Sequence, residues 1–346
     1  MISTGYAFAS AYLKGEEARL VTSEHVDRMS KTSTIQDALG VIKETDIGSY
    51  LEEVPLRTFD DVEEYLWVYF RSCLERLEGF KLMPAGMLKI LRTYMVKYDV
   101  LNIKAALWGI STGRKARMIP VGVVHSYGLM DKLASAENLK DIVETLTECK
   151  LGNYAEILEE HEKHTNGGAT SRLTTEARLD SEYYKNMLDT ARAIKDGALF
   201  SKVCGILIDL TNLQIVSRAI IEGMGPDAAE CTIAGGYLIT ERAIKDFLSL
   251  KMTELPHRLE NTQYSDVASE VSSSYDRTGR ITAVQEIIDK HQFRLLKEIL
   301  SPRVLSPLVI AWYLIIKEVE IRNLRLVLKM IVDGMPVEEI KEYLVL

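Results

Sequence analysis

The feature that most constrains this chain is a helical pattern that occurs three times. The three segments are YDVLNIKAALWGISTG (98–113), LIDLTNLQIVSRAIIEG (207–223) and EVEIRNLRLVLKMIVDG (318–334). In each segment an acidic residue precedes an asparagine by three positions, and a glycine follows that asparagine by eleven. The asparagines, Asn102, Asn212 and Asn323, are 110 and 111 residues apart. This spacing divides the 346 residues into thirds, so the fold has to accommodate an internal repeat.

Each segment predicts a long amphipathic helix, which we call a strut helix. Between the acid and the glycine, apolar residues recur at positions i, i+3, i+6, i+7 and i+10, which is one face of an α-helix, and only Ser217 breaks the pattern. The glycines stand where the end of a helix favours a left-handed residue. Gly113, Gly223 and Gly334 are therefore predicted to be the C-caps of the three strut helices.

The asparagines need a separate explanation, because asparagine is a poor helix former in the middle of a helix. A buried amide must find hydrogen-bond partners, so the repeated asparagine predicts an interhelix hydrogen bond that fixes the register of the helices. The alternative is an exposed amide beside the apolar face. The threefold recurrence favours the hydrogen bond.

The rest of the sequence supports an all-α fold. Strand signals are weak, since no alternating runs are bounded by Asn-Gly or Asp-Gly turns. A second similarity relates IQDALGVIKETDIGSY (35–50) to LKDIVETLTECKLGNY (139–154). We therefore predict one helical body of three pseudo-repeats, approximately 5–118, 119–229 and 230–346. Copies related by a third of a turn would close on themselves, but the period alone does not distinguish a closed body from an open stack.

Composition excludes several classes of function. Lys plus Arg is 42 and Asp plus Glu is 50, which gives a net charge of −8 and argues against a general nucleic-acid binder. The apolar run at 304–316 contains Ser306 and Pro307 and is shorter than the roughly 20 residues that a membrane-spanning helix needs. The N-terminal sequence has no signal-peptide pattern, so we expect a cytoplasmic protein.

No pattern of a catalytic, cofactor or metal site stands out. There is no G-x-x-x-x-G-K-[ST] sequence for nucleotide phosphates, and the four cysteines are far apart. His161 and His164 in EEHEKH have the H-x-x-H spacing of some zinc ligands, but no companion motif follows, and we interpret them as part of a charged helix face. A helical metalloenzyme built around His161 is thus the least favoured alternative, and we expect no enzyme activity.

The triple pattern, together with LGNYAEILEE and VEIRNLRLVLKMIVDGMPVEEIKEYLV, resembles the C subunit of archaeal and bacterial A/V-type ATP synthases, a family that includes the d subunit of the vacuolar ATPase. The resemblance extends from Tyr6 to the last residues. One departure occurs in the first helix, where YAFASAY has Ser10 and Tyr12 at positions that often carry arginine in this family. Any role of those two charges does not transfer to this chain.

The resemblance implies a funnel-shaped body of three pseudo-symmetric units without catalysis or cofactors. It implies a position in the central rotor, at the cytoplasmic face of the cell membrane, between the ring of proteolipid subunits and the central axle of the D and F subunits. Such a protein would couple ion translocation to ATP synthesis or hydrolysis. The alternative is a solenoid-type α-helical scaffold, although the period of ~110 residues is long compared with the 20–50 residues usual for solenoids.

A partner surface is predicted where the strut helices end. Related strut ends should lie at one rim of a closed body. The loops that follow the three glycines are cationic after Gly113, small after Gly223 and apolar after Gly334. The candidate interface residues are Arg114, Lys115, Arg117, Met224 and Met335, and the alternative is that these loops are ordinary solvated surface.

Overall fold

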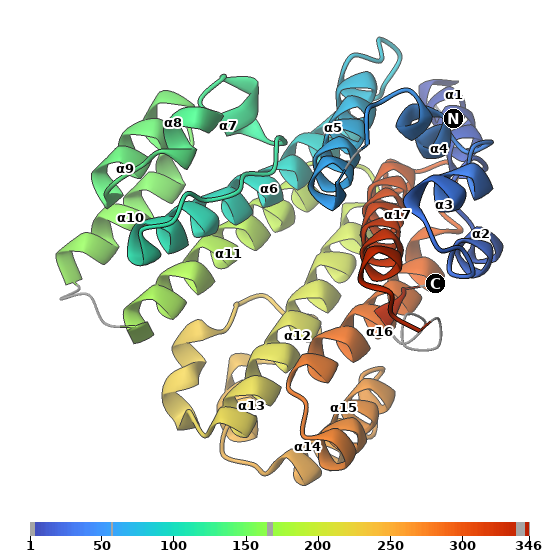
Figure 1. Ribbon diagram of the computed structural model, residues 1–346. Coiled ribbons are helices and arrows are strands. Elements are labelled where there is room, and N and C mark those ends of the chain that lie inside the picture. The colour runs from blue at the N-terminus through green and yellow to red at the C-terminus, as the bar shows by residue number, and fades with distance from the viewer. Residues whose placement is uncertain (1–3, 57, 165–168, 337–342, 346) are drawn as a thin grey trace. The chain divides into compact units, whose positions relative to one another are not determined.

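The described part of the chain is all-α, as predicted, with helices joined by turns and irregular segments (Figure 1). The computed structural model describes residues 4–56, 58–164, 169–336 and 343–345, and within these ranges there is no strand. The first ten helices are α1 (Thr4–Glu17), α2 (Ser23–Met29), α3 (Ile35–Val41), α4 (Asp46–Glu52), α5 (Phe59–Glu78), α6 (Ala85–Thr112), α7 (Val123–Ser126), α8 (Met130–Ala134), α9 (Leu139–Glu148) and α10 (Gly152–His164). The chain continues with α11 (Ala169–Arg192), α12 (Gly197–Glu222), η1 (Gly225–Cys231), α13 (Glu241–Phe247), η2 (Met252–Glu254), α14 (Leu255–Leu259), α15 (Ser265–Thr278), α16 (Thr282–Leu300) and α17 (Leu308–Asp333).

The three predicted strut helices are α6, α12 and α17. They have 28, 26 and 26 residues, and so each is roughly 40 Å long at the α-helical rise of 1.5 Å per residue. The predicted apolar face is confirmed, because the first four of its five positions are buried in every strut helix. Ser217, the exception in the pattern, is buried as well, and its hydroxyl has no hydrogen-bond partner among the described residues.

The glycines end the strut helices as predicted. Gly113, Gly223 and Gly334 have φ angles of +65°, +68° and +66°, which is the left-handed region that favours glycine. At each end the next backbone N–H turns back to a carbonyl five residues earlier, as in the bond from Met224 N to Ala219 O of 2.9 Å.

The chain divides into two compact units, residues 1–91 with 296–346 and residues 92–295. The first unit contains α17, and the second contains most of α6 and all of α12. The division into three repeats near 5–118, 119–229 and 230–346 stays a prediction.

In the unit of residues 92–295, α11 and α12 pack along one another, and α10 contacts both α9 and α11 (Figure 1). The helix α12 is apolar around most of its circumference, and it buries Phe200, Ile206 and Leu213 among others. A helix with this pattern belongs in a core.

In the other unit, α17 is the central element and contacts α1, α2, α3 and α5. Its first half is almost completely buried, including Trp312 and Tyr313. The indole Nε1 of Trp312 donates to the Glu17 carboxylate at 3.2 Å, so that α1 is held by a polar contact as well as by apolar packing.

The two departures in the first helix have a structural explanation. Ser10 is 1% exposed, so an arginine at this position would have to be buried. Tyr12 stacks on Phe80, with ring centroids 5.0 Å apart, and Phe8 stacks on the same ring at 5.7 Å. Phe8 and Tyr12 therefore pack α1 against Phe80.

Among the described residues, one helix is long and apolar enough by composition to cross a membrane, and it is α12. The apolar run at 304–316 is not part of that helix. In α12 most of the apolar window is buried inside the protein, and core helices of soluble proteins have the same length and composition.

Candidate functional site

Each of the three repeated asparagines binds the backbone of one residue through both ends of its amide. Asn102 Nδ2 donates to Ile119 O at 2.9 Å, and Ile119 N donates to Asn102 Oδ1 at 2.8 Å. Asn212 makes the same pair of bonds with Ile233, at 2.7 and 2.8 Å. Asn323 does so with Val345, at 2.6 and 3.2 Å. The repeat in the sequence is therefore also a repeat in hydrogen bonding.

The asparagines are buried and hydrogen-bonded, but the predicted interhelix partner is wrong. Ile119, Ile233 and Val345 all lie in irregular segments outside any helix. Such segments carry backbone N–H and C=O groups that no helical ladder pairs, and a buried amide satisfies one of each. The asparagines thus fix connecting segments to the strut helices.

The acids one turn earlier bind further backbone N–H groups. The carboxylate of Asp99 accepts from Val123 N at 2.8 Å and from Val124 N at 2.9 Å, at the start of α7. The carboxylate of Asp209 accepts from Leu238 N at 2.7 Å and Ile239 N at 3.2 Å, and also from the Tyr264 hydroxyl at 2.7 Å. Both acids are satisfied by uncharged donors.

The third acid, Glu320, has a charged partner. Its Oε2 accepts from Lys317 Nζ at 2.8 Å, and its Oε1 accepts from Val21 N at 2.9 Å. The side chains of Lys317 and Glu320 are 1% and 2% exposed. Lys317 Nζ also donates to the Tyr69 hydroxyl at 3.0 Å, which joins α17 to α5.

Burial shifts the acidity of all three acids in the same direction. Removal from water raises the pKa of Asp99 to about 7, against the opposing effect of its two backbone N–H donors. Burial also raises the pKa of Asp209, against its backbone and tyrosine donors, and that of Glu320, against the attraction of Lys317. These groups are costly to bury, and the hydrogen bonds described above offset part of that cost.

Two glycines that the repeated pattern does not include lie against these acids. A Cβ atom on Gly122 would be 2.4 Å from Asp99 Oδ1, and one on Gly236 would be 2.1 Å from Asp209 Oδ1. Gly122 also has φ of +111°. The two glycines follow Asn102 and Asn212 at unequal distances along the chain, so no fixed period marks them in the sequence.

The predicted interface residues are on the surface. Arg114, Lys115 and Arg117 are exposed, and Met224 and Met335 are 37% and 38% exposed. Met335 belongs to a different compact unit from the other four. Their arrangement at one common rim stays a prediction.

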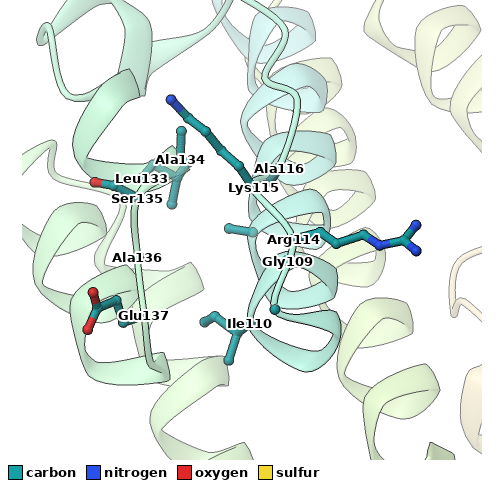
Figure 2. A pocket seen from close by; sticks show the side chains of 12 residues that line it. Gly109, Ile110, Arg114, Lys115, Ala116, Leu133, Ala134, Ser135, Ala136 and Glu137 are labelled. Atoms are coloured by element: carbon teal, nitrogen blue, oxygen red, sulfur yellow. The ribbon is translucent and has the colours of Figure 1, made fainter.

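A pocket of about 450 Å³ lies at the end of α6, which we call the α6 pocket (Figure 2). Its floor consists of small and aliphatic side chains of α6 and α8, among them Ala106, Ile110 and Leu133. Figure 2 shows Ile110 pointing into the gap and Lys115 extending toward Ala134, whereas Arg114 points away. The pocket therefore joins an apolar floor to one of the predicted interface cations.

No metal site is found among the side chains that the structure describes, since no group of three or more His, Cys, Asp or Glu residues suits a metal ion. His161 Nδ1 lies 2.7 Å from Thr175 Oγ1, and burial lowers the pKa of its ring. The side chain of His164 lies outside the described residues. His161 thus has a structural hydrogen-bond partner.

Comparison with known proteins gives a consistent picture. The family described as ATP synthase (C/AC39) subunit matches residues 9–343. The C subunit of the A-type ATP synthase of Methanocaldococcus jannaschii is 25% identical over 354 residues, covering 98% of this chain and 86% of that protein. The proteins of the same name from Thermococcus kodakarensis and Methanobrevibacter smithii are 25% and 26% identical, with 98% of this chain and 90% and 88% of those proteins covered.

Proposed function

Because the chain belongs to the ATP synthase (C/AC39) subunit family, we propose that it is a non-catalytic part of the central rotor of an A-type ATP synthase. In this role it couples the proteolipid ring in the membrane to the axle formed by the D and F subunits, and so links ion translocation to ATP synthesis or hydrolysis. The observation that carries the proposal is the family match over residues 9–343, which includes all three strut helices.

The physical properties of the strut helices suit this role. A part that transmits torque must deform little under load. The strut helices are roughly 40 Å long and are capped at their ends, and buried hydrogen bonds fix their connecting segments. Such helices resist local opening, because opening would leave buried polar groups without hydrogen-bond partners in an apolar core.

The partner surface of the proposed rotor part includes Arg114, Lys115, Arg117, Met224 and Met335. Exposed cations and methionines suit a contact between proteins, since charges steer association and methionine adapts to irregular surfaces. The funnel shape with these residues at one rim belongs to the same proposal, as does a position at the cytoplasmic face of the membrane, peripheral to the ring.

Purification and omission test the function. Affinity purification of the tagged chain from native membranes should recover a proteolipid ring and nucleotide-binding subunits. Omission of the chain should leave ATP hydrolysis by the soluble head and abolish ATP-driven ion pumping. Undiminished pumping in its absence would refute the rotor role.

A further inference from the structure

Two stretches of chain, residues 113–116 and residues 133–137, line the α6 pocket on opposite sides. On one side, the segment after Gly113 crosses the last turn of α6 closely, and a Cβ atom on Gly109 would be 2.8 Å from Arg114 O. Ala116 is buried against this turn. On the other side, the turn between α8 and α9 supplies Ser135, Ala136 and Glu137.

The basic segment, which we define as residues 114–117, is held at both ends. Arg114 N donates to Gly109 O at 3.2 Å, and Asn102 binds both backbone groups of Ile119 just beyond the segment. Within the described residues, the side chains of Arg114 and Lys115 have no hydrogen bond or ion pair. Binding of a partner would therefore order little backbone and break no existing ion pair of these two cations.

The connection that follows the second strut helix is longer than the one that follows α6. The connection from Asn212 to its partner Ile233 spans 21 residues, whereas that from Asn102 to Ile119 spans 17. The longer connection contains η1, which packs against α11, α12 and α13. Here α13 is the short helix that follows the backbone partners of Asp209, whereas those of Asp99 lie in the first turn of α7 itself.

The segment η1 is acidic and buries one small apolar side chain. Its sequence, GPDAAEC, buries Ala228 and leaves Asp227 and Glu230 exposed. The α6 pocket has an apolar floor and a cation at its mouth, and its own connection is too short to contain such a segment. The two strut ends thus differ in the sign of the charge that follows the glycine and in whether a short helical segment packs beside the strut helix.

We propose that the α6 pocket is the docking site for a short acidic segment of another protein of the complex, which places a small apolar side chain on the floor and a carboxylate against Lys115. Glu137 lies on the other side of the pocket, in the α8–α9 turn. Its carboxylate would repel a carboxylate of the partner placed on that side, which disfavours the reversed orientation of the partner segment. The proposal rests on the proposed function in so far as the partner belongs to the same rotary complex.

A small metabolite fits the pocket less well than a protein segment. Sites for small molecules position their ligands with polar groups directed from a largely enclosed wall. In the α6 pocket the charged or hydroxyl-bearing side chains in the lining are Arg114, Lys115, Ser135 and Glu137, and all four are exposed at its edge.

Two experiments on the whole complex test the docking. In the first, a benzophenone amino acid replaces Ser135 in the tagged chain, and the purified complex is irradiated. We expect a cross-link to an Asp- or Glu-rich peptide of another protein of the complex, identified by mass spectrometry. The matched control carries the same group at Arg242, an exposed residue of α13 without a described ion pair, and should not give that product.

In the second, Lys115→Glu is compared with Arg242→Glu, which makes the same charge change away from the pocket. Lys115→Glu should weaken retention of the chain in the complex by about tenfold in a salt-sensitive way, as expected for a charge contact made repulsive. Arg114→Glu should have a smaller effect, because Arg114 points away from the pocket. Thermal unfolding of each variant alone checks that it is folded.

The outcomes separate the two proposals. If the unmodified chain fails to copurify with the complex, both proposals fail. If it copurifies and supports pumping while Lys115→Glu behaves like Arg242→Glu, only the docking proposal is overturned. Cross-links from position 135 to a second copy of this chain, or to a peptide without acidic residues, also overturn it.

Discussion

Asp209 and Glu320 occupy the same position of the repeat, in α12 and in α17, and they are satisfied in different ways. Asp209 accepts from two consecutive backbone N–H groups and a tyrosine hydroxyl, all 29 to 55 residues away in the sequence. Glu320 accepts from one backbone N–H, 299 residues away, and from Lys317. Asp99 in α6 resembles Asp209, with two backbone donors.

The difference follows from the number of neutral donors within reach. Two or more backbone N–H groups satisfy a buried carboxylate without a cation. Only one backbone N–H of the described residues, that of Val21, reaches the Glu320 carboxylate, and Lys317 provides the remaining donor. The residue three positions before the acid is accordingly Ile206 in α12 but Lys317 in α17.

The largest effect is expected from Lys317→Met, which removes the cation that pairs with Glu320 in α17. The change leaves the Glu320 carboxylate buried with one hydrogen bond and no cation, and should lower the free energy of unfolding by about 3–5 kcal/mol. Urea unfolding measures this loss. Adding Glu320→Gln should recover most of it, and the control Ile206→Met should cost less than about 1.5 kcal/mol. Equal losses in Lys317→Met and Ile206→Met would contradict the comparison.

A pH dependence of stability should arise from Asp99, whose buried carboxyl group has only neutral donors among the described residues. Asp99 keeps its proton up to about pH 7 in the folded protein but loses it near pH 4 when unfolded. The folded state therefore binds the extra proton between these values, and its stability falls as pH rises through this window and levels off above about pH 7. At about 1.4 kcal/mol per pKa unit, the change is at most about 4 kcal/mol.

Unfolding by urea at several pH values between 4 and 8 tests this expectation. Asp99→Asn should flatten the profile, because asparagine does not titrate, whereas the exposed control Asp131→Asn should leave it unchanged. Identical profiles for the unmodified protein and Asp99→Asn would show that Asp99 does not titrate in this range.

The smallest of the three effects concerns what the strut helices share. Asn212→Leu leaves the N–H and C=O of Ile233 without partners, and should cost about 2–3 kcal/mol. Asn323→Leu should cost a similar amount, since its two bonds to Val345 have the same pattern. The control is Asn153→Leu, at an exposed residue that bonds to the Glu182 side chain. A loss in Asn212→Leu no larger than in this control would show that the repeated amide has no role in stability.

The features that could be predicted from sequence are those that have a period. The buried face of each strut helix and the left-handed glycines follow from positions within a single helix. The partners of the asparagines follow at 17, 21 and 22 residues, and they are isoleucine or valine in irregular segments. Such residues have no side-chain signal, because it is their backbone that is bound.

Lys317 illustrates a second kind of limit. A lysine three residues before a glutamate is a common pair on exposed helix faces, where it adds little stability. Only the packing of α1, α2 and α5 around α17 places this pair in a core. For the α6 pocket, the sequence predicted the exposed cations, but the floor depends on the α8–α9 turn, whose distance from α6 is a tertiary property.

The bond between Val21 and Glu320 also bears on how the protein is made. The unit of residues 92–295 is continuous in the sequence, so it can complete its contacts while synthesis proceeds. Residues 1–91 are synthesised before that unit, yet α17, on which they pack, is synthesised after it. We therefore expect residues 1–91 to remain incompletely packed until α17 has been synthesised, so that this unit folds later than the unit of residues 92–295.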